Sequence, residues 1–438
     1  MSIFETRLDG QLTTGRRKFS YRAPGSRAWH DLAPYSEDAF VPLAVEAATN
    51  ALYALRKVSG RYELQRIVLE GSLLETKVAS NPRVDIDGVV RSGDGQRVIG
   101  YTYADEKRHT IYFDPEYQAL QASLAKALPD LPLITFVSSS ADGRKSLLFA
   151  GGDTDPGRYY LFDRQKKSLG EVLLDRPRLA GRKFAPMKAI SYKAADGTTV
   201  PAYLTLPVGK IVRNLPAIVF PHGGPSSRDE WGFDWIAQFL AARGYAVIQP
   251  NYRGSAGYGD HWLNENGFKG WKTSISDVNA AARFLADEGI ADPARIAIVG
   301  WSYGGYAALQ SAATEPGLYK AVAAIAPVTD LAMLKRESAG FTNKREVAAF
   351  VGTGPHLIEG SPVNVAANIR SPVLLIHGDL DNNVFVTHSD KMEEQLRRAG
   401  GQVEYLRYKG LDHQLEDGEV RAQILAKLAV HLSKTIGR

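Results

Sequence analysis

From about residue 185 onward, apolar runs alternate with amphipathic helical patterns. Five unbroken apolar runs follow a hairpin at 189–207, and they cover residues 216–221, 245–250, 296–300, 321–327 and 372–378. Helical patterns cover residues 231–243, 274–289, 304–316, 386–399 and 416–435. Unbroken apolar strands that alternate with helices are typical of a mostly parallel sheet covered on both faces. We therefore predict an α/β domain over residues 185–438, with its functional site beyond the carboxyl ends of the strands.

The residues before this domain show a different pattern, in which short strands are broken by turn residues. Three segments share one plan of two apolar runs about a turn: 50–71, 93–114 and 141–163. The pairs Asp94-Gly95 and Asp142-Gly143 are 48 residues apart. Paired strands at this period are typical of β-propeller blades, of which a closed ring has about four to eight. We predict a β-rich, partial propeller-like domain over residues 1–184, as either an incomplete ring or an open sheet.

A tight turn joins the apolar run at 296–300 to the helix predicted at 304–316. The turn reads Gly300-Trp301-Ser302-Tyr303-Gly304, which is the Gly-x-Ser-x-Gly pattern. The pattern alone is common, but between a strand and a helix it indicates a nucleophile elbow, which holds the serine hydroxyl above the sheet. Glycines are expected on both sides because a side chain would collide with the turn. Ser302 is therefore the candidate nucleophile.

A serine nucleophile needs a base, and the base needs an orienting acid. In this fold class the acid and then the histidine follow the serine along the chain. The loop after the strand at 372–376 carries Asp379 and Asp381, of which we favour Asp381 as the acid and Asp379 as a loop brace. Two histidines follow. His388 lies in a helical pattern and is expected at the surface, whereas His413 lies on a loop and is the predicted base.

An oxyanion hole is expected beside the nucleophile. The segment FPHGGPSS (220–227) follows a strand, and its glycines allow backbone N–H groups to face a ligand. We assign the main-chain N–H groups of Gly224 and Tyr303 to the hole, since the second donor in this architecture follows the nucleophile. His222 precedes the nucleophile and is expected to brace the loop.

Two further residues lie in the segment NYRGSAGYGD (251–260). Tyr252 and Arg253 either contact a substrate carboxylate or carbonyl, or they brace the loop beside the oxyanion strand. Both interpretations stay open. Asp277 and Asp330 are interpreted as structural anchors.

Composition narrows the function classes further. The chain has 438 residues, 44% hydrophobic and 23% charged, and a net charge of +5 without basic blocks, so we expect no nucleic-acid partner. It contains no cysteine, which excludes disulfides and a thiol nucleophile. No apolar run is long enough for a membrane span, and we find no pattern for a metal or cofactor. The first residues lack an apolar signal core, which favours the cytoplasm, or the periplasm if the N-terminus is incomplete.

With these residues identified, the chain resembles the prolyl oligopeptidase family of serine peptidases. The matching segments occur in the family's order: HGGP (222–225), NYRGSAGYGD (251–260), GWSYGGY (300–306), APVTD (326–330), HGDLDNNV (377–384) and DH (412–413). The resemblance implies the triad Ser302, Asp381 and His413, and a β-propeller that covers the active site. HGGP resembles the acylaminoacyl peptidase branch, because a tyrosine replaces His222 in the prolyl oligopeptidase and dipeptidyl peptidase branches. The propeller region is shorter than the family's, and no tryptophan lies between residues 327 and 360 to stack on a substrate proline.

The sequence therefore predicts a cofactor-independent serine peptidase that acts on short peptides or acyl-peptides through an acyl-enzyme. A carboxylesterase with the same triad is the alternative, since triad chemistry does not distinguish esters from amides. A third alternative is a binding protein with an inactive hydrolase domain. The oligomeric state stays open, a homo-oligomer included.

Overall fold

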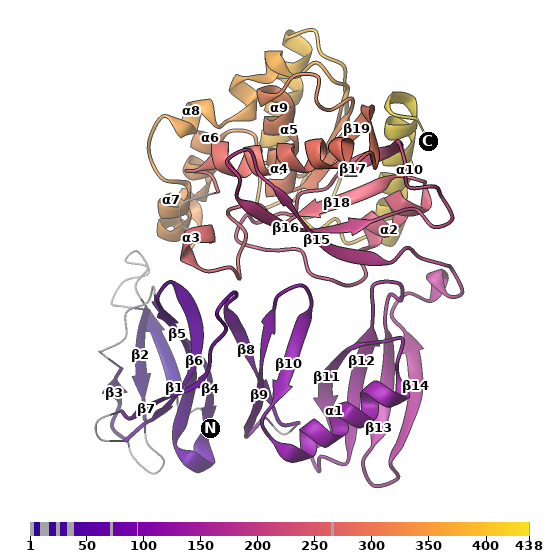
Figure 1. Ribbon diagram of the computed structural model, residues 1–438. Helices are drawn as coiled ribbons and strands as arrows, with labels where there is room; N and C mark the ends of the chain where they lie inside the picture. The colour runs from indigo at the N-terminus through magenta and orange to yellow at the C-terminus, as the bar shows by residue number, and fades with distance from the viewer. Residues whose placement is uncertain are drawn as a thin grey trace. The chain divides into compact units, whose positions relative to one another are not determined.

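The computed structural model describes residues 4–8, 17–22, 27–32, 39–70, 73–93, 95–263 and 267–437. These residues form two compact units (Figure 1). Unit 1 comprises Met1–Lys183 with Glu230–Phe233 and Gly257–His261, and unit 2 comprises the rest. The predicted boundary between two independent domains, at residues 184 and 185, stays a prediction.

Unit 1 consists of small antiparallel sheets. Its described strands form four separate sheets: β1 (Phe4–Leu8), β2 (Arg17–Tyr21) and β3 (His30–Asp31); β4 (Phe40–Glu46), β5 (Ala51–Val58), β6 (Arg61–Val68) and β7 (Glu75–Ala79); β8 (Ile86–Arg91), β9 (Val98–Ala104) and β10 (Arg108–Tyr112); and β11 (Leu133–Ser139), β12 (Lys145–Gly151), β13 (Arg158–Asp163) and β14 (Ser168–Leu174). The three predicted hairpins are β5–β6, β9–β10 and β12–β13. The open-sheet alternative is wrong, because each hairpin belongs to a different sheet.

The repeated turns follow from their glycines. Gly95 and Gly143 have φ values of +71° and +67°, a region in which a glycine is favoured because it has no Cβ. Asp142 accepts a hydrogen bond from the N–H of Arg144 at 3.1 Å and so closes its turn. Asp94, the matching residue of the other pair, lies outside the described residues.

A helix that the sequence analysis did not predict, α1 (Pro115–Ala127), lies beside the edge of β10. Its cap signals are present in the sequence: Asp114 accepts hydrogen bonds from the first turn, and proline occupies the first helical position. Gln118 and Gln121 then donate to the carbonyls of Tyr112 and Thr110, at 2.7 and 3.1 Å. The helix therefore satisfies edge carbonyls that a fourth strand would otherwise bind.

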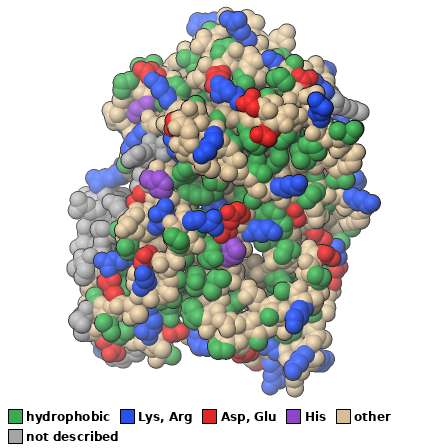
Figure 2. Space-filling view, in the orientation of Figure 1, with side chains coloured by type: hydrophobic (Ala, Val, Ile, Leu, Met, Phe, Trp, Pro, Cys, Tyr) green, Lys and Arg blue, Asp and Glu red, His purple; other side chains and the backbone are tan. Residues whose placement is uncertain are grey.

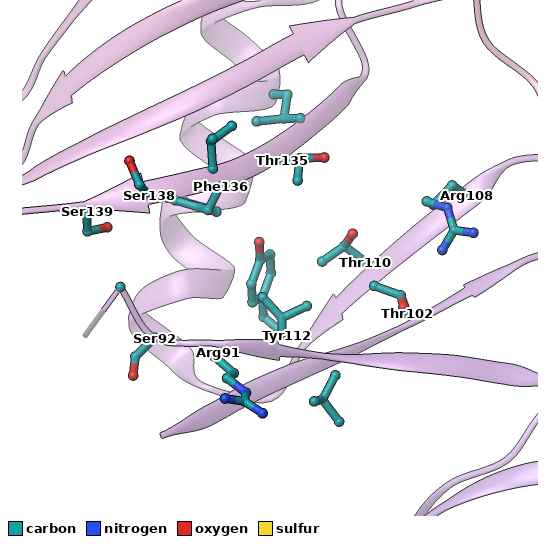
Figure 3. A pocket seen from close by; sticks show the side chains of 15 residues that line it. Arg91, Ser92, Thr102, Arg108, Thr110, Tyr112, Thr135, Phe136, Ser138 and Ser139 are labelled. Atoms are coloured by element: carbon teal, nitrogen blue, oxygen red, sulfur yellow. The ribbon is translucent and has the colours of Figure 1, made fainter. Parts of the chain in front are cut away.

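A cavity of about 380 Å³, lined by both hydroxyl-bearing and apolar side chains, lies between the β8–β10 sheet and β11 (Figure 3). Hydroxyl groups line it from both sides, among them those of Thr110 and Thr135, and the hydroxyl of Tyr112 points into it. Arg108, also in its wall, is held by Asp87 and by Glu230. Beside the cavity, Tyr112 packs edge-on against Phe136 of β11 at a centroid distance of 6.3 Å, so apolar side chains join the two sheets there.

Unit 2 is built on one eight-stranded sheet in the order β15-β16-β18-β17-β19-β20-β21-β22. The strands are β15 (Met187–Lys193), β16 (Thr199–Thr205), β17 (Leu215–Val219), β18 (Ala246–Pro250), β19 (Ala291–Trp301), β20 (Val322–Ile325), β21 (Val373–Gly378) and β22 (Val403–Tyr408). The pairs β15–β16 and β16–β18 are antiparallel, and all later pairs are parallel. The five predicted apolar strands and the hairpin are confirmed.

Helices cover both faces of this sheet (Figure 1). On one face, α2 (Trp235–Ala242) and α10 (Gly418–Thr435) bury apolar side chains against the central strands. Alternate strand residues point to the other face, where α4 (Trp271–Asp287), α5 (Tyr303–Thr314) and α9 (Thr387–Arg398) lie. The sequence did not predict the shorter helices α3 (Asp260–Leu263), α6 (Leu331–Glu337), α7 (Lys344–Val351) and α8 (His356–Glu359).

Within the described ranges, no helix is both long and apolar enough to cross a bilayer. On the face that Figure 2 shows, Lys and Arg side chains lie scattered among acidic and apolar ones.

The α1 contacts lead to a prediction for unit 1. Replacing both Gln118 and Gln121 with alanine removes two partly buried hydrogen bonds and should lower the free energy of unfolding by about 1–2 kcal/mol. Amide hydrogen exchange in β9 and β10 should also accelerate. Ser123→Ala, an exposed change on the same helix, is the matched control. Unchanged exchange in the double variant would contradict this role of α1.

Candidate active site

The turn between β19 and α5 holds Ser302 in an unusual conformation. The strand ends at Trp301 and the helix begins at Tyr303, so Ser302 alone joins them. Its φ and ψ are +59° and −120°, and its N–H donates to the carbonyl of Ile325 at 2.8 Å. A non-glycine residue held at positive φ stores strain, which is found preferentially at functional sites.

Two glycines make this turn sterically feasible. A Cβ on Gly300 would lie 2.0 Å from the carbonyl oxygen of Gly304. A Cβ on Gly304 would lie 2.2 Å from the carbonyl oxygen of Pro221, on the predicted oxyanion loop. Both contacts are with backbone, which has no rotamer through which to move away. The elbow and the oxyanion loop can pack this closely only because both positions are glycine.

The predicted acid and base are in direct contact. His413 Nδ1 lies 2.6 Å from Asp381 Oδ2, and the two residues are 8% and 3% exposed. The indole N–H of Trp301 donates to the carbonyl of His413 at 3.0 Å, which fixes the histidine loop against the residue before Ser302. Among the described contacts, the Ser302 hydroxyl and the His413 ring form no direct hydrogen bond; in enzymes without substrate this bond is often long.

Asp381 is held as a carboxylate by hydrogen bonds. Its Oδ1 accepts from the N–H groups of Asn383 and Val384 at 2.8 and 2.9 Å. Burial favours the neutral acid, but hydrogen bonds from His377 and His413 outweigh this effect and hold the pKa of Asp381 well below its usual value. A charged partner for the His413 imidazolium is therefore available across the working pH range.

The neighbouring carboxylate has the role that the sequence predicted for it. Asp379 Oδ1 accepts from the N–H of Gly410 at 2.7 Å and so ties its loop to the segment before His413.

The expectation that His388 is a surface residue is wrong. Its side chain is fully buried, and its Nδ1 accepts from the N–H groups of Thr329 and Asp330 at 3.0 and 3.3 Å. The apolar face of α9 turns His388 toward the loop after β20, a contact that a helical pattern does not reveal. His388 bonds to that loop and not to Asp381.

The predicted oxyanion loop packs directly against the candidate nucleophile. A Cβ on Gly223 would lie 3.4 Å from Ser302 Cβ, and Gly224 adopts φ +120°, a conformation that favours glycine. Tyr303 is the first residue of α5, where the N–H has no carbonyl one turn earlier to bind. Gly223 therefore lies beside Ser302, and the predicted donors Gly224 and Tyr303 directly follow Gly223 and Ser302 in the chain.

His222 braces the oxyanion loop, as the sequence predicted. Its Nδ1 lies 2.6 Å from the carbonyl of Gly223 and its Nε2 lies 2.8 Å from Ser255 Oγ. The ring also stacks on Tyr252 at a centroid distance of 4.5 Å. Burial lowers the pKa of His222 to about 4, so the ring is neutral at pH 7.

For Tyr252 and Arg253 the geometry favours the bracing interpretation. Tyr252 is fully buried, and its hydroxyl donates to the carbonyl of His222 at 2.8 Å. Arg253 donates from Nε and Nη2 to the fully buried carboxylate of Asp277, at 2.9 and 2.7 Å. Asp330, the other predicted anchor, caps α6 through the N–H of Met333.

The sequence analysis assigned no role to His377, although the structure places it in the site. His377 Nε2 lies 3.2 Å from Asp381 Oδ2, the oxygen that His413 Nδ1 also contacts. The available signal was its position near the end of a buried strand, four residues before the acid.

Comparison with known proteins agrees with this geometry. Residues 231–438 match the model of the prolyl oligopeptidase family. This segment is a prolyl oligopeptidase family domain. It contains the candidate nucleophile, acid and base; the oxyanion loop at 220–227 precedes it.

Relatives of this domain align with longer stretches of the chain than residues 231–438. Dipeptidyl aminopeptidase BIII of Pseudoxanthomonas mexicana is 27% identical over 83% of this chain and 53% of its own length. Acylamino-acid-releasing enzyme 1 of Oryza sativa subsp. japonica is 27% identical over 58% of this chain and 36% of its own length. The chain therefore spans about half, or less, of the length of these relatives.

Solved structures establish the fold. A puromycin-hydrolyzing peptidase of Mycobacterium tuberculosis superposes with a TM-score of 0.78 and 23% identity, over 96% of this chain and 65% of the other. An acylaminoacyl peptidase of Pyrococcus horikoshii gives 0.74 and 18%, over 99% and 69%. The predicted α/β-hydrolase fold, preceded by a β-rich propeller-like region, is confirmed.

The elbow geometry predicts a strong effect of one methyl group. Gly304→Ala should destabilise unit 2 by about 3 kcal/mol or prevent its folding, because the added Cβ meets backbone on the oxyanion loop. Gly340→Ala, whose Cβ would meet nothing within 4 Å, is the matched control and should change stability little. Melting temperature and soluble yield measure both. Equal melting temperatures for the two variants would contradict the proposed close approach.

The neutral His222 ring predicts a dependence of stability on pH. Its pKa is lower in the folded protein than the ordinary 6.5, so the unfolded chain binds more protons between pH 6.5 and about 4, and stability falls as the pH falls through that window. In His222→Gln the fall in the free energy of unfolding between pH 7 and pH 4.5 should be smaller than in wild type by about 2 kcal/mol. Urea unfolding at a series of pH values measures the difference. Parallel curves for both proteins would argue against a buried neutral ring.

Proposed function

We propose that the chain is a cofactor-independent serine peptidase that hydrolyses short peptides through an acyl-enzyme. The observation that carries the proposal is the 2.6 Å contact between His413 and Asp381, on a loop that Trp301 bonds to the elbow of Ser302. This contact pairs the predicted base with the predicted acid, and the Trp301 bond ties the histidine loop to the turn of the candidate nucleophile, which supports a triad of the acyl-transfer type. The prolyl oligopeptidase family match over residues 231–438 supports the same chemistry.

The reaction begins with proton removal from Ser302. His413 receives the hydroxyl proton at Nε2 while the serine oxygen attacks the acyl carbon. Asp381, a carboxylate bonded to Nδ1, selects the tautomer with Nε2 free and stabilises the imidazolium that forms. His413 then returns the proton to the leaving amine. Water attacks the acyl-enzyme by the same sequence and regenerates Ser302.

The negative oxygen of the tetrahedral intermediate is assigned to the main-chain N–H groups of Gly224 and Tyr303. The position of Tyr303 at the start of α5 also favours negative charge there, because the helix dipole is positive at its N-terminus. Since His222 occupies the place of a tyrosine and is bonded within its loop, the proposed hole is made of backbone only.

We further propose that the bond cut lies near the N-terminus of a peptide, with a free or acylated amine. The names of two relatives, a dipeptidyl aminopeptidase and an acylamino-acid-releasing enzyme, support this substrate class. The esterase alternative uses the same residues, so substrate comparison has to separate the two.

Activity-based labelling tests the proposal. A fluorophosphonate probe should label wild type stoichiometrically and should not label Ser302→Ala. Asp381→Asn should lower kcat by about 10⁴-fold, because the amide favours the wrong His413 tautomer. Asp379→Asn is the matched control, since this neighbouring carboxylate only braces the loop, and its kcat should stay within a few-fold of wild type. Folded wild-type protein without labelling would refute the proposal and favour the inactive-hydrolase alternative.

A substrate panel decides between peptidase and esterase. We expect turnover of dipeptidyl and acylaminoacyl anilides, with kcat/KM compared against nitrophenyl esters of the same acyl groups. Turnover of the esters alone would refute the peptidase assignment.

A further inference from the structure

His377 is a buried histidine directly behind the triad acid. It lies near the end of β21, four residues before Asp381, and none of its side chain is exposed. It cannot contact substrate, so any effect on the reaction has to pass through Asp381.

The contacts of the His377 ring determine its tautomer. Its Nε2 faces two acceptors, the carbonyl of Val384 at 2.9 Å and Asp381 Oδ2 at 3.2 Å. Its Nδ1 faces a hydroxyl that can donate, Ser389 Oγ at 2.7 Å. A neutral imidazole satisfies all three partners only with its proton on Nε2 and its lone pair on Nδ1. With Ser389 of α9 as the donor to Nδ1, His377 therefore keeps an N–H at Nε2, which donates to the carbonyl of Val384 and lies 3.2 Å from Asp381 Oδ2.

This N–H is the fourth polar group around the acid, 3.2 Å from Oδ2. Backbone N–H groups of Asn383 and Val384 bind Oδ1, whereas His413 and His377 share Oδ2. The two histidines come from different segments, one on β21 and one on the loop before α10. Without His377, the His413 ring would be the only side chain among the described residues that contacts Oδ2, and the plane of the carboxylate would be less constrained.

We propose that His377 is a positioning residue of the active site, which fixes the Asp381 carboxylate so that Oδ2 stays aligned with His413 Nδ1. Ser389 belongs to the same device because it sets the tautomer of His377. The inference rests on the proposed function, in that it assigns a role in the reaction of Ser302.

Two substitutions of His377 separate positioning from packing. His377→Leu keeps an apolar shape but removes the N–H, whereas His377→Gln places an amide N–H near the position of Nε2. We expect kcat to fall about tenfold in His377→Leu and to be largely restored in His377→Gln, since small misalignments of catalytic groups are costly. KM should stay within twofold of wild type in both, because His377 does not touch substrate.

Ser389→Ala is the second variant, for the case that His377→Leu does not fold. It leaves His377 in place but frees its tautomer, and kcat should fall about threefold with KM unchanged. His388→Gln is the matched control: this equally buried histidine is the neighbour of Ser389 on α9 but bonds to a different loop. Its kcat should stay within twofold of wild type.

The outcomes separate this inference from the proposed function. Wild type that reacts with the fluorophosphonate probe, together with an unchanged kcat in folded His377→Leu or in Ser389→Ala, would overturn the positioning role alone. An equal loss in His377→Gln and His377→Leu would also overturn it, because packing would then explain both. Failure of the wild type to react would refute the proposed function and this inference with it.

Discussion

The close approach of three backbone segments is the constraint on which the site depends. The end of β19, the start of α5 and the loop after β17 meet where a Cβ on Gly300 or Gly304 would lie within 2.2 Å of a carbonyl oxygen. At this contact Ser302 adopts positive φ, and Gly223 of the same loop lies beside it. The strain at Ser302 is tolerated because the surrounding sheet and helix, both deeply buried, leave the turn no other path.

Behind this turn, the polar groups of the site are held in bonded sets. The Asp381 carboxylate accepts three hydrogen bonds and lies 3.2 Å from His377 Nε2, and the buried carboxylate of Asp277 is matched by the fork of Arg253. A buried charge without such partners would be costly, whereas a satisfied one is rigid. The proposed reaction requires one tautomer of His413 and N–H groups in fixed positions. Rigid surroundings keep both unchanged from one turnover to the next. His222 and Tyr252 are held in the same way, because their rings stack on each other and the Tyr252 hydroxyl donates to the loop backbone.

Unit 1 meets a different constraint, which is the protection of strand edges. Its described strands belong to four separate sheets, and each sheet exposes edge groups that would bind another strand. Beside β10 this edge is covered by α1, whose glutamines bind the carbonyls of Thr110 and Tyr112. A cavity next to the same strand lies beside the apolar contact between Tyr112 and Phe136. These features accompany a chain that spans about half the length of its dipeptidyl aminopeptidase relative.

The sequence by itself determined those features that depend on local pattern. Apolar runs marked the central strands because a strand buried on both faces has few polar positions, and Gly300 and Gly304 marked the elbow because only glycine fits a turn of that kind. The order of Ser302, Asp381 and His413 followed from the same fold. Tertiary structure alone decided how buried side chains pair: His388 is inside, His377 stands behind the acid, and Arg253 binds Asp277. A helical or strand period shows which face is apolar, but a polar residue on a buried face depends on partners that come from distant segments, and no local pattern encodes those contacts.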